Sequence, residues 1–148
     1  MKSKSDLSIA THILLALAHS VASNDSIPKA KRSKLLNSKD FSKTTGSHDV
    51  VIRRLLAPLV KSGILVSQAG RGGGVRLGVD PSKLRFDDVL RALETGDVVK
   101  KHSSPKVKSC PVSCQIASVL EFVSMTAEDA LMGAFHKLTL KQLYERIR

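Results

Sequence analysis

The feature that most constrains the fold is a glycine-rich segment, 70–74, which lies between two short runs of β-prone residues, 64–67 and 75–77. Such runs on either side of a glycine-rich turn predict a β-hairpin. The segment is not a nucleotide-binding loop, because its glycines lack the G-x-G-x-x-G spacing and no Lys-Ser or Lys-Thr pair follows them. A hairpin tip explains the glycines better, with Arg71 at that tip.

A pair of helices precedes this hairpin. The pattern predicts a short helix over 38–44 capped by Ser38, a turn at Gly46, and a longer helix that is capped by Ser47 and ends at Gly63. This order is typical of a helix-turn-helix. A helix-turn-helix followed by a hairpin predicts a winged helix, so we expect a mainly α fold with a small β-hairpin wing.

The rest of the chain predicts four further helices, which cover 6–21 with Ser5 as the cap, 86–95, 111–137, and a short segment capped by Thr139. In the last helix, Leu143 and Ile147 should face inward. The sequence thus predicts a DNA-binding domain over 1–96, a linker over 97–109, and a dimerisation element over 110–148 that contains a long helix.

The apolar residues of the long helix recur in alternating steps of four and three, a seam by which helices pair. An apolar stripe of this length needs a partner surface, and its alanines permit close approach of a second helix. The sequence therefore predicts a homodimer, and the predicted interface residues are Ile116, Leu120, Val123, Ala127, Ala130 and Ala134.

The charge of the chain favours nucleic acid as the partner. Lys and Arg together number 24 against 13 Asp and Glu, which gives a formal net charge of +11. The basic run formed by Lys29, Lys31, Arg32 and Lys34 is either a DNA-backbone arm or a solvated loop. The most apolar early stretch, 9–18, is much shorter than the roughly 20 residues that span a bilayer. We therefore expect a cytoplasmic protein with no membrane partner.

The start of the longer helix is the predicted reading element, because the second helix of a helix-turn-helix enters the major groove. Arg53 and Arg54 either bind a base or phosphate or pair within the protein. Asp49 either accepts a hydrogen bond from cytosine or caps its own helix, and Arg71 is placed to probe the minor groove. The predicted DNA-binding residues are Ser38, Ser47, His48, Asp49, Val50, Arg53, Arg54, Arg71, Gly72, Gly73 and Arg76.

Two cysteines, Cys110 and Cys114, lie one helical turn apart near a predicted helix start. A helix N-terminus and the nearby Lys106 and Lys108 lower a thiol pKa, so a redox switch is one interpretation and packed thiols are another. A cluster or metal site is a third, with His102 as a further ligand, but four good ligands are not evident. We expect no cofactor, and the chain has no set of catalytic residues that would make it an enzyme.

Several segments of the chain resemble the sequences of a known protein family. These segments are 38–41, Gly46, 51–63, 70–77, 88–94, 110–112 and 138–140. Over nearly its whole length from Asp6 the chain resembles the Rrf2 family of bacterial regulators. The resemblance implies a winged-helix dimer with a long helix at its interface, acting at a palindromic operator. Known members include iron–sulfur and nitric-oxide sensors, a cysteine-metabolism repressor, and a branch with no known cofactor, and the last fits this chain best.

The chain departs from the family pattern in three places. Its loop over 22–37 is longer and more basic than usual, and Arg85 stands where a Ser or Thr usually caps the next helix. At the wing, many members have an arginine where this chain has Ala69 and a proline where it has Arg71, so Arg71 takes over the predicted groove contact.

Together these features predict a homodimeric DNA-binding transcriptional regulator, most simply a repressor, that acts on a palindromic operator. One alternative is an iron–sulfur or thiol redox sensor. The other is a nucleic-acid-binding module without sequence specificity.

Overall fold

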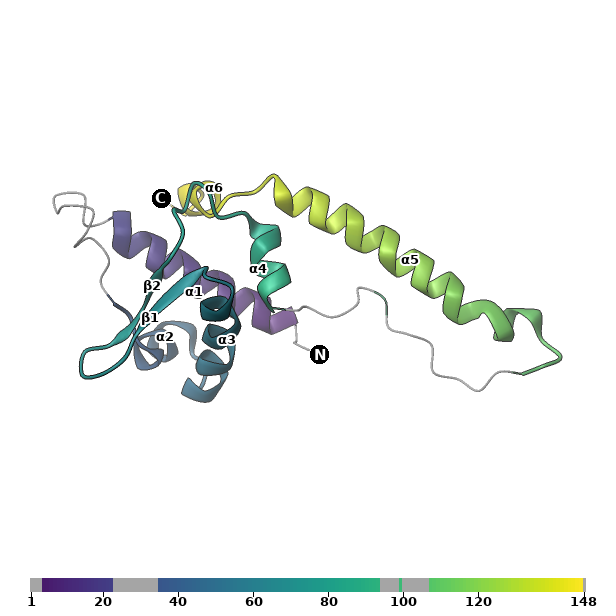
Figure 1. Ribbon diagram of the computed structural model, residues 1–148, viewed down its shortest axis with the longest axis horizontal. Coiled ribbons are helices and arrows are strands. Elements are labelled where there is room, and N and C mark those ends of the chain that lie inside the picture. Colours follow the sequence, from purple (N-terminus) through teal and green to yellow (C-terminus); the bar gives the residue numbers. More distant parts are fainter. Residues whose placement is uncertain (1–3, 23–34, 94–98, 100–106, 148) are drawn as a thin grey trace.

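The computed structural model describes residues 4–22, 35–93, 99 and 107–147. Its elements, in chain order, are α1 (Lys4–Ala22), α2 (Ser38–Thr45), α3 (Asp49–Lys61), β1 (Leu65–Gln68), β2 (Gly74–Leu77), α4 (Phe86–Leu93), α5 (Pro111–His136) and α6 (Leu140–Glu145). All but α5 gather into one body, and α5 projects away from it (Figure 1). The mainly helical fold with one antiparallel hairpin confirms the predicted winged helix.

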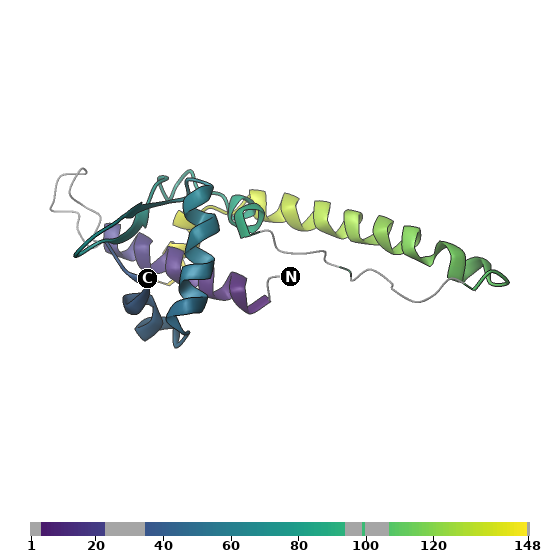
Figure 2. The same ribbon diagram turned by 60° about the horizontal axis from the view of Figure 1, so that its bottom comes forward.

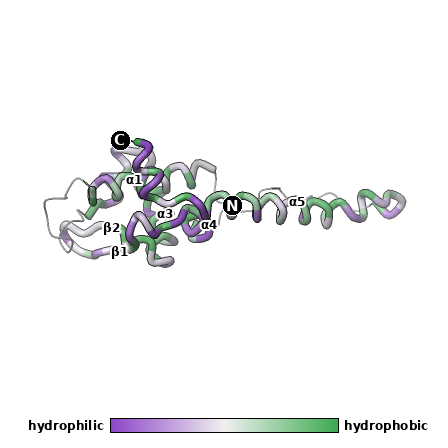
Figure 3. Tube along the Cα trace, turned by 90° about the horizontal axis from the view of Figure 1, so that it is seen from above, coloured by the Kyte–Doolittle hydropathy of each residue, from purple (hydrophilic) through white to green (hydrophobic). Residues whose placement is uncertain are grey.

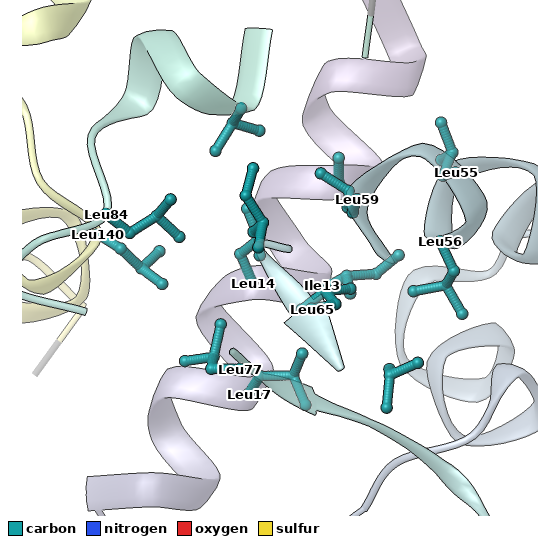
Figure 4. Close-up of a cluster of buried hydrophobic side chains, with 14 of the residues drawn as sticks. Ile13, Leu14, Leu17, Leu55, Leu56, Leu59, Leu65, Leu77, Leu84 and Leu140 are labelled. Atoms are coloured by element: carbon teal, nitrogen blue, oxygen red, sulfur yellow. The ribbon is translucent and has the colours of Figure 1, made fainter. Parts of the chain in front are cut away.

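The core of the body is aliphatic and joins every layer (Figure 4). Residues of α1, α3, the hairpin, α6 and the loop before α4 converge there, among them Ile13, Leu14, Leu17, Leu55, Leu59, Leu65, Leu84 and Leu140. Each buried side chain of this kind stabilises the fold by roughly 1.5–3 kcal/mol relative to exposure. The core therefore fixes α3 and the hairpin relative to each other.

The hairpin is tied to the start of α2 by backbone hydrogen bonds on its outer edge. The Leu36 N–H donates to the Val75 carbonyl at 3.1 Å, and the Val75 N–H donates to the Leu36 carbonyl at 2.8 Å. This approach requires a glycine at position 74, because a Cβ there would lie 2.5 Å from the Leu36 carbonyl oxygen. The wing and the helix-turn-helix are thus one connected unit.

Three predicted helix caps are wrong. Asn37, and not Ser38, caps α2, because its side chain accepts from the N–H groups of both Lys39 and Asp40. At α3 the extended backbone of His48 occupies the N-cap position without a side-chain cap bond, so Ser47 lies one residue too early. Ser5 lies inside α1, which begins at Lys4.

The C-terminal segment packs onto the body. The predicted capping box of Thr139 and Gln142 is confirmed at the start of α6. Leu140 is 1% exposed in the shared core, and Leu143 packs against that core. Ile147, predicted to face inward, is 62% exposed because α6 ends before it. The predicted boundary between domains at residue 110 stays a prediction.

The C-terminal end of α5 is anchored to the start of α4. The Phe86 N–H donates to the Leu138 carbonyl and the Leu140 N–H donates to the Leu84 carbonyl, both at 2.9 Å. The Arg85 guanidinium also donates to the His136 carbonyl at 2.6 Å, so it satisfies an unpaired acceptor at the end of α5. We call this set of contacts the α4–α5 joint.

A buried carboxylate completes the α4–α5 joint. The side chain of Asp87 is 3% exposed, and its Oδ2 lies 3.0 Å from Nδ1 of His136 and 3.3 Å from Nη2 of Arg91. Burial alone raises the pKa of this carboxyl. The hydrogen bond and charge of His136, together with the charge of Arg91, outweigh burial and lower the pKa below its ordinary value.

The joint predicts an acid-dependent contribution to stability. A carboxyl whose pKa is lowered on folding stabilises the protein above its ordinary pKa, roughly 3.9, and loses that contribution as pH falls through the folded-state value. We expect Asp87→Asn to lower the free energy of unfolding at pH 7 by about 1.5–3 kcal/mol. Below pH 3.9 or so the difference from wild type should shrink.

Urea denaturation across this pH range measures the effect. The matched control is Asp88→Asn, because Asp88 is the neighbouring residue on α4 and is exposed. A constant difference between wild type and Asp87→Asn at every pH would contradict the assignment.

Candidate nucleic-acid interface

One edge of the body brings together α2, the start of α3 and the tip of the hairpin. This edge lies opposite α6 (Figure 1). In Figure 2, α3 runs upright and α2 lies beside its lower end. Several predicted DNA-binding residues are exposed there or nearby on the hairpin, namely His48, Val50, Arg53, Arg71 and Arg76, whereas Ser38, Ser47 and Asp49 are half-buried.

Asp49 connects α2 to α3 and holds Arg53. Its Oδ1 accepts from the Ser42 hydroxyl at 2.6 Å, and its Oδ2 accepts from Nη2 of Arg53 at 3.3 Å. The Ser38 hydroxyl lies within 3.5 Å of both Asp49 and Arg53. Asp49 also lies in the first turn of α3, where the helix dipole favours a negative charge. Asp49 does not cap α3, because His48 occupies the N-cap position, and its carboxylate is instead engaged within the protein by Ser42 and Arg53.

Arg53 is braced and still accessible. Its side chain is 66% exposed although its guanidinium contacts Asp49 and Ser38. A guanidinium that is positioned in advance loses less side-chain entropy when it binds a base or a phosphate. Sequence reasoning identified Arg53 and named Ser38 and Asp49 as DNA-binding candidates, but it could not show that these two residues hold Arg53.

Arg54 has a different role from its neighbour. Its Nη2 lies 3.0 Å from Oδ1 of Asp6, whose side chain is 4% exposed in α1. Consecutive residues of a helix point about 100° apart, so Arg54 faces α1 while Arg53 stays with α2. The ion pair favours the intramolecular interpretation of Arg54.

The wing presents Arg71 at an exposed turn. Gly72 has a φ of 77°, a conformation that side chains other than glycine rarely adopt. A Cβ at Gly73 would overlap the Gln68 carbonyl oxygen. The turn itself therefore requires these glycines, and their absence of side chains also leaves the hairpin tip open to a phosphate backbone.

A continuous apolar face runs along α5 outside the body, and Figure 3 shows hydrophobic segments along this helix. Val123 is 45% exposed, and Ala130 and Ala134 are also exposed, whereas Ile116 and Ala127 are half-buried. The predicted seam missed three large exposed residues of this face, Val112, Val119 and Phe122, at 68%, 53% and 72%, whereas Met125, at 60%, lies on the opposite side of the helix from Val123. We call the eight residues other than Met125 the α5 face.

Leu120 lies beside the α5 face and not at its centre. It is half-buried and lines a small cavity together with Val99, Ser124 and Glu128. The backbone N–H of Val99 donates to the Ser124 hydroxyl at 3.4 Å, so the linker contacts α5 on this side. The same four-and-three spacing runs from Val112 through Ile116 to Val119. The sequence could therefore have indicated this part of the α5 face as well.

The two cysteines lie at the far end of α5 and interact locally. Cys110 is the N-cap residue, and its Sγ accepts from the Ser113 N–H at 3.4 Å. The Cys114 thiol, which is exposed, donates to the Val107 carbonyl at 3.6 Å. His102, Lys106 and the basic run over 29–34 lie outside the described residues.

The donors in the described part of the chain do not fit an iron site. No group of three or more His, Cys, Asp or Glu side chains comes together there in a way that could hold a metal ion. The two thiols supply fewer ligands than an iron–sulfur cluster needs. In the same part of the chain, none of the helices combines the length and the apolarity needed to cross a membrane.

Comparison with known proteins gives a family match over residues 3–146, to the Rrf2 model, which is described as an iron-dependent transcriptional regulator. The chain is also similar to YwnA of Bacillus subtilis (strain 168), a protein assigned to the HTH-type transcriptional regulators. The two are 27% identical over 112 residues, which cover 75% of this chain and 83% of YwnA.

Solved structures share the fold at low sequence identity. A crystal structure from Lactobacillus plantarum, assigned as a transcriptional regulator, has a TM-score of 0.76 and 21% identity, covering 98% of this chain and 91% of its own. IscR of T. potens has a TM-score of 0.65 and 16% identity, covering 100% and 89%. CymR, the global cysteine regulator of B. subtilis, has a TM-score of 0.63 and 18% identity, covering 99% and 98%.

The two neighbouring arginines of α3 should separate binding from stability. We expect Arg53→Ala to weaken binding to duplex DNA and to change the free energy of unfolding by less than about 0.5 kcal/mol, because its pair with Asp49 is largely exposed. Arg54→Ala should lower the free energy of unfolding by about 1–2 kcal/mol, because the buried Asp6 loses this partner. Fluorescence anisotropy and urea denaturation measure the two effects. Equal losses of stability in both variants would contradict these separate roles for Arg53 and Arg54.

Proposed function

The chain belongs to the Rrf2 family of transcriptional regulators, and on that premise we propose that it binds a palindromic operator as a homodimer and represses transcription. As a member of this family it is a DNA-binding regulator and not an enzyme. The proposal of operator binding rests on one observation. The exposed Arg53, held in place by its neighbours, lies at the edge of the body that also contains α2, the start of α3 and the wing. The net charge of +11 adds a general attraction to DNA.

The α5 face supports a second copy of this chain as its partner. It presents Val112, Val119, Phe122 and Val123 to solvent on a helix that projects from its own body. A helix of 26 residues is about 39 Å long. The small residues Ala127, Ala130 and Ala134 follow the large ones along the same face, so two such helices can approach closely. A self-complementary surface of this kind is typical of a two-fold symmetric dimer.

A dimer accounts for how two recognition helices read one operator. The α4–α5 joint fixes each body relative to its own α5, so pairing through α5 fixes the distance between the two α3 helices. Helix-turn-helix dimers place these helices about 34 Å apart, one turn of DNA, on half-sites related by two-fold symmetry. A dimer held on both half-sites excludes other proteins from the promoter, which is the simplest route to repression. Such a regulator works in the cytoplasm.

We expect a charge placed in the α5 face to separate the protomers. Val123→Glu should convert the dimer to a monomer, because pairing would bury two carboxylates without partners. It should also abolish selective binding to the inverted repeat that wild type selects from genomic fragments. Analytical ultracentrifugation and competition against random duplex DNA measure these effects.

The control for this variant is Gln142→Glu, which adds the same charge at an exposed position on α6, where a capping box accepts Glu as well as Gln. Wild-type protein that sediments as a monomer while it still protects an inverted repeat would overturn the dimer. Wild-type protein that binds random DNA as tightly as genomic DNA would overturn operator recognition and favour a non-specific module.

We further propose that the protein works without an iron–sulfur cluster, because the described residues offer two thiols and no third nearby ligand. Protein purified without oxygen should show no visible colour, because the sulfur-to-iron charge transfer that colours a cluster requires bound iron and free thiols do not absorb visible light. Visible spectroscopy with iron and sulfide analysis measures this. Stoichiometric iron with visible absorption would contradict the proposal.

A thiol-based signal is the second candidate for regulation, favoured by the exposure of Cys114 one turn into α5. Operator affinity that changes on mild oxidation of wild type, and does not change in Cys114→Ser, would support it. Equal affinities before and after oxidation would remove it.

A further inference from the structure

We propose that Val50 reads the methyl group of a thymine in each half-site, next to the base pair that Arg53 contacts. This inference rests on the proposed function, because it requires that the start of α3 enters the major groove of an operator. It assigns a specificity role to an aliphatic side chain and predicts what the operator contains.

The observation behind the proposal is the exposure of Val50. Its side chain is 76% exposed, whereas the other large apolar side chains of α3 are buried or half-buried, namely Val51, Ile52, Leu55, Leu56, Leu59 and Val60. Single exposed apolar residues are common on protein surfaces. This one stands in the first turn of the helix whose N-terminal residues contact base edges in helix-turn-helix proteins.

The chemistry of the major groove supplies one apolar feature that suits a valine. Thymine presents a C5-methyl group there, whereas the other edges of the base pairs present hydrogen-bond donors and acceptors. A β-branched side chain has one strongly preferred rotamer in a helix, so Val50 loses little conformational entropy on contact. Its apolar surface leaves water when it meets the methyl group, which favours thymine over cytosine.

The position of Val50 relative to Arg53 fixes where the thymine lies. Residues three apart share one face of a helix, and they are separated by about 4.5 Å along the axis. Base pairs rise 3.4 Å along DNA. The thymine read by Val50 is therefore within about one or two base pairs of the base pair read by Arg53, which Asp49 holds in place.

The test removes one methyl group at a time from the operator. Each symmetric pair of thymines in the selected repeat is replaced by deoxyuridine, which lacks only the methyl group. At one pair of positions we expect the affinity of wild type to fall about four-fold per half-site, or about sixteen-fold in all, from the loss of one buried methyl group on each side. In Val50→Ala the same replacement should have a clearly smaller effect, because the shortened side chain covers less of the methyl group.

The matched control is Val107→Ala, the same substitution at a side chain that is 53% exposed, in a residue whose backbone N–H donates to the Ser113 hydroxyl in the first turn of α5. This variant should keep the full response to deoxyuridine. Urea denaturation checks that Val50→Ala folds normally, which its exposure predicts.

The outcomes separate this inference from the proposed function. Selective operator binding with no effect of methyl removal at any position would overturn the role of Val50 and would leave the proposed function intact. A methyl effect of equal size in wild type and Val50→Ala would also overturn it, because another residue would then read the thymine. A wild-type protein with no preference for any operator would overturn both proposals together.

Discussion

The α4–α5 joint is the constraint on which the arrangement of the whole molecule depends. Backbone hydrogen bonds from Phe86 to Leu138 and from Leu140 to Leu84 run on both sides of the turn that follows α5. The buried carboxylate of Asp87 then contacts His136 at the end of α5. Because hydrogen bonds have directional geometry while apolar packing tolerates sliding, these contacts fix the direction of α5 as well as its position.

A second constraint acts at the opposite edge, where Asp49 and Ser38 hold Arg53. The excess of basic residues attracts any DNA, because the phosphate backbone has the same charge at every sequence. Selectivity requires side chains that meet base edges in one geometry. In the proposed function, the braced Arg53 and the exposed Val50 supply this selectivity, while Arg54 connects α3 to α1.

Much of the fold follows from the sequence, because periodic apolar residues and glycine turns are local signals. The helix pair, the hairpin and the capping box at Thr139 could be predicted in this way. Features that require a choice between two neighbouring residues are harder to predict from the sequence. Asn37 and Ser38 are both good caps, Arg53 and Arg54 have the same chemistry, and Val119 and Leu120 both fit a four-and-three seam. Tertiary contacts decide between such neighbours: Asp6 attracts Arg54, and Val99 lies beside Leu120.

The two constraints act together through the length of α5. A helix about 39 Å long amplifies small rotations at its anchored end, so a rotation of about 5° moves the far end by about 3 Å, which is close to the rise of one base pair. In the proposed dimer, a flexible joint would let the distance between the two recognition helices vary by about the rise of one base pair. A charged and hydrogen-bonded joint reduces that freedom in a way that apolar packing alone would not. In the proposed dimer, the contacts of the buried Asp87 where α5 meets the body therefore help to set the spacing of the two recognition helices.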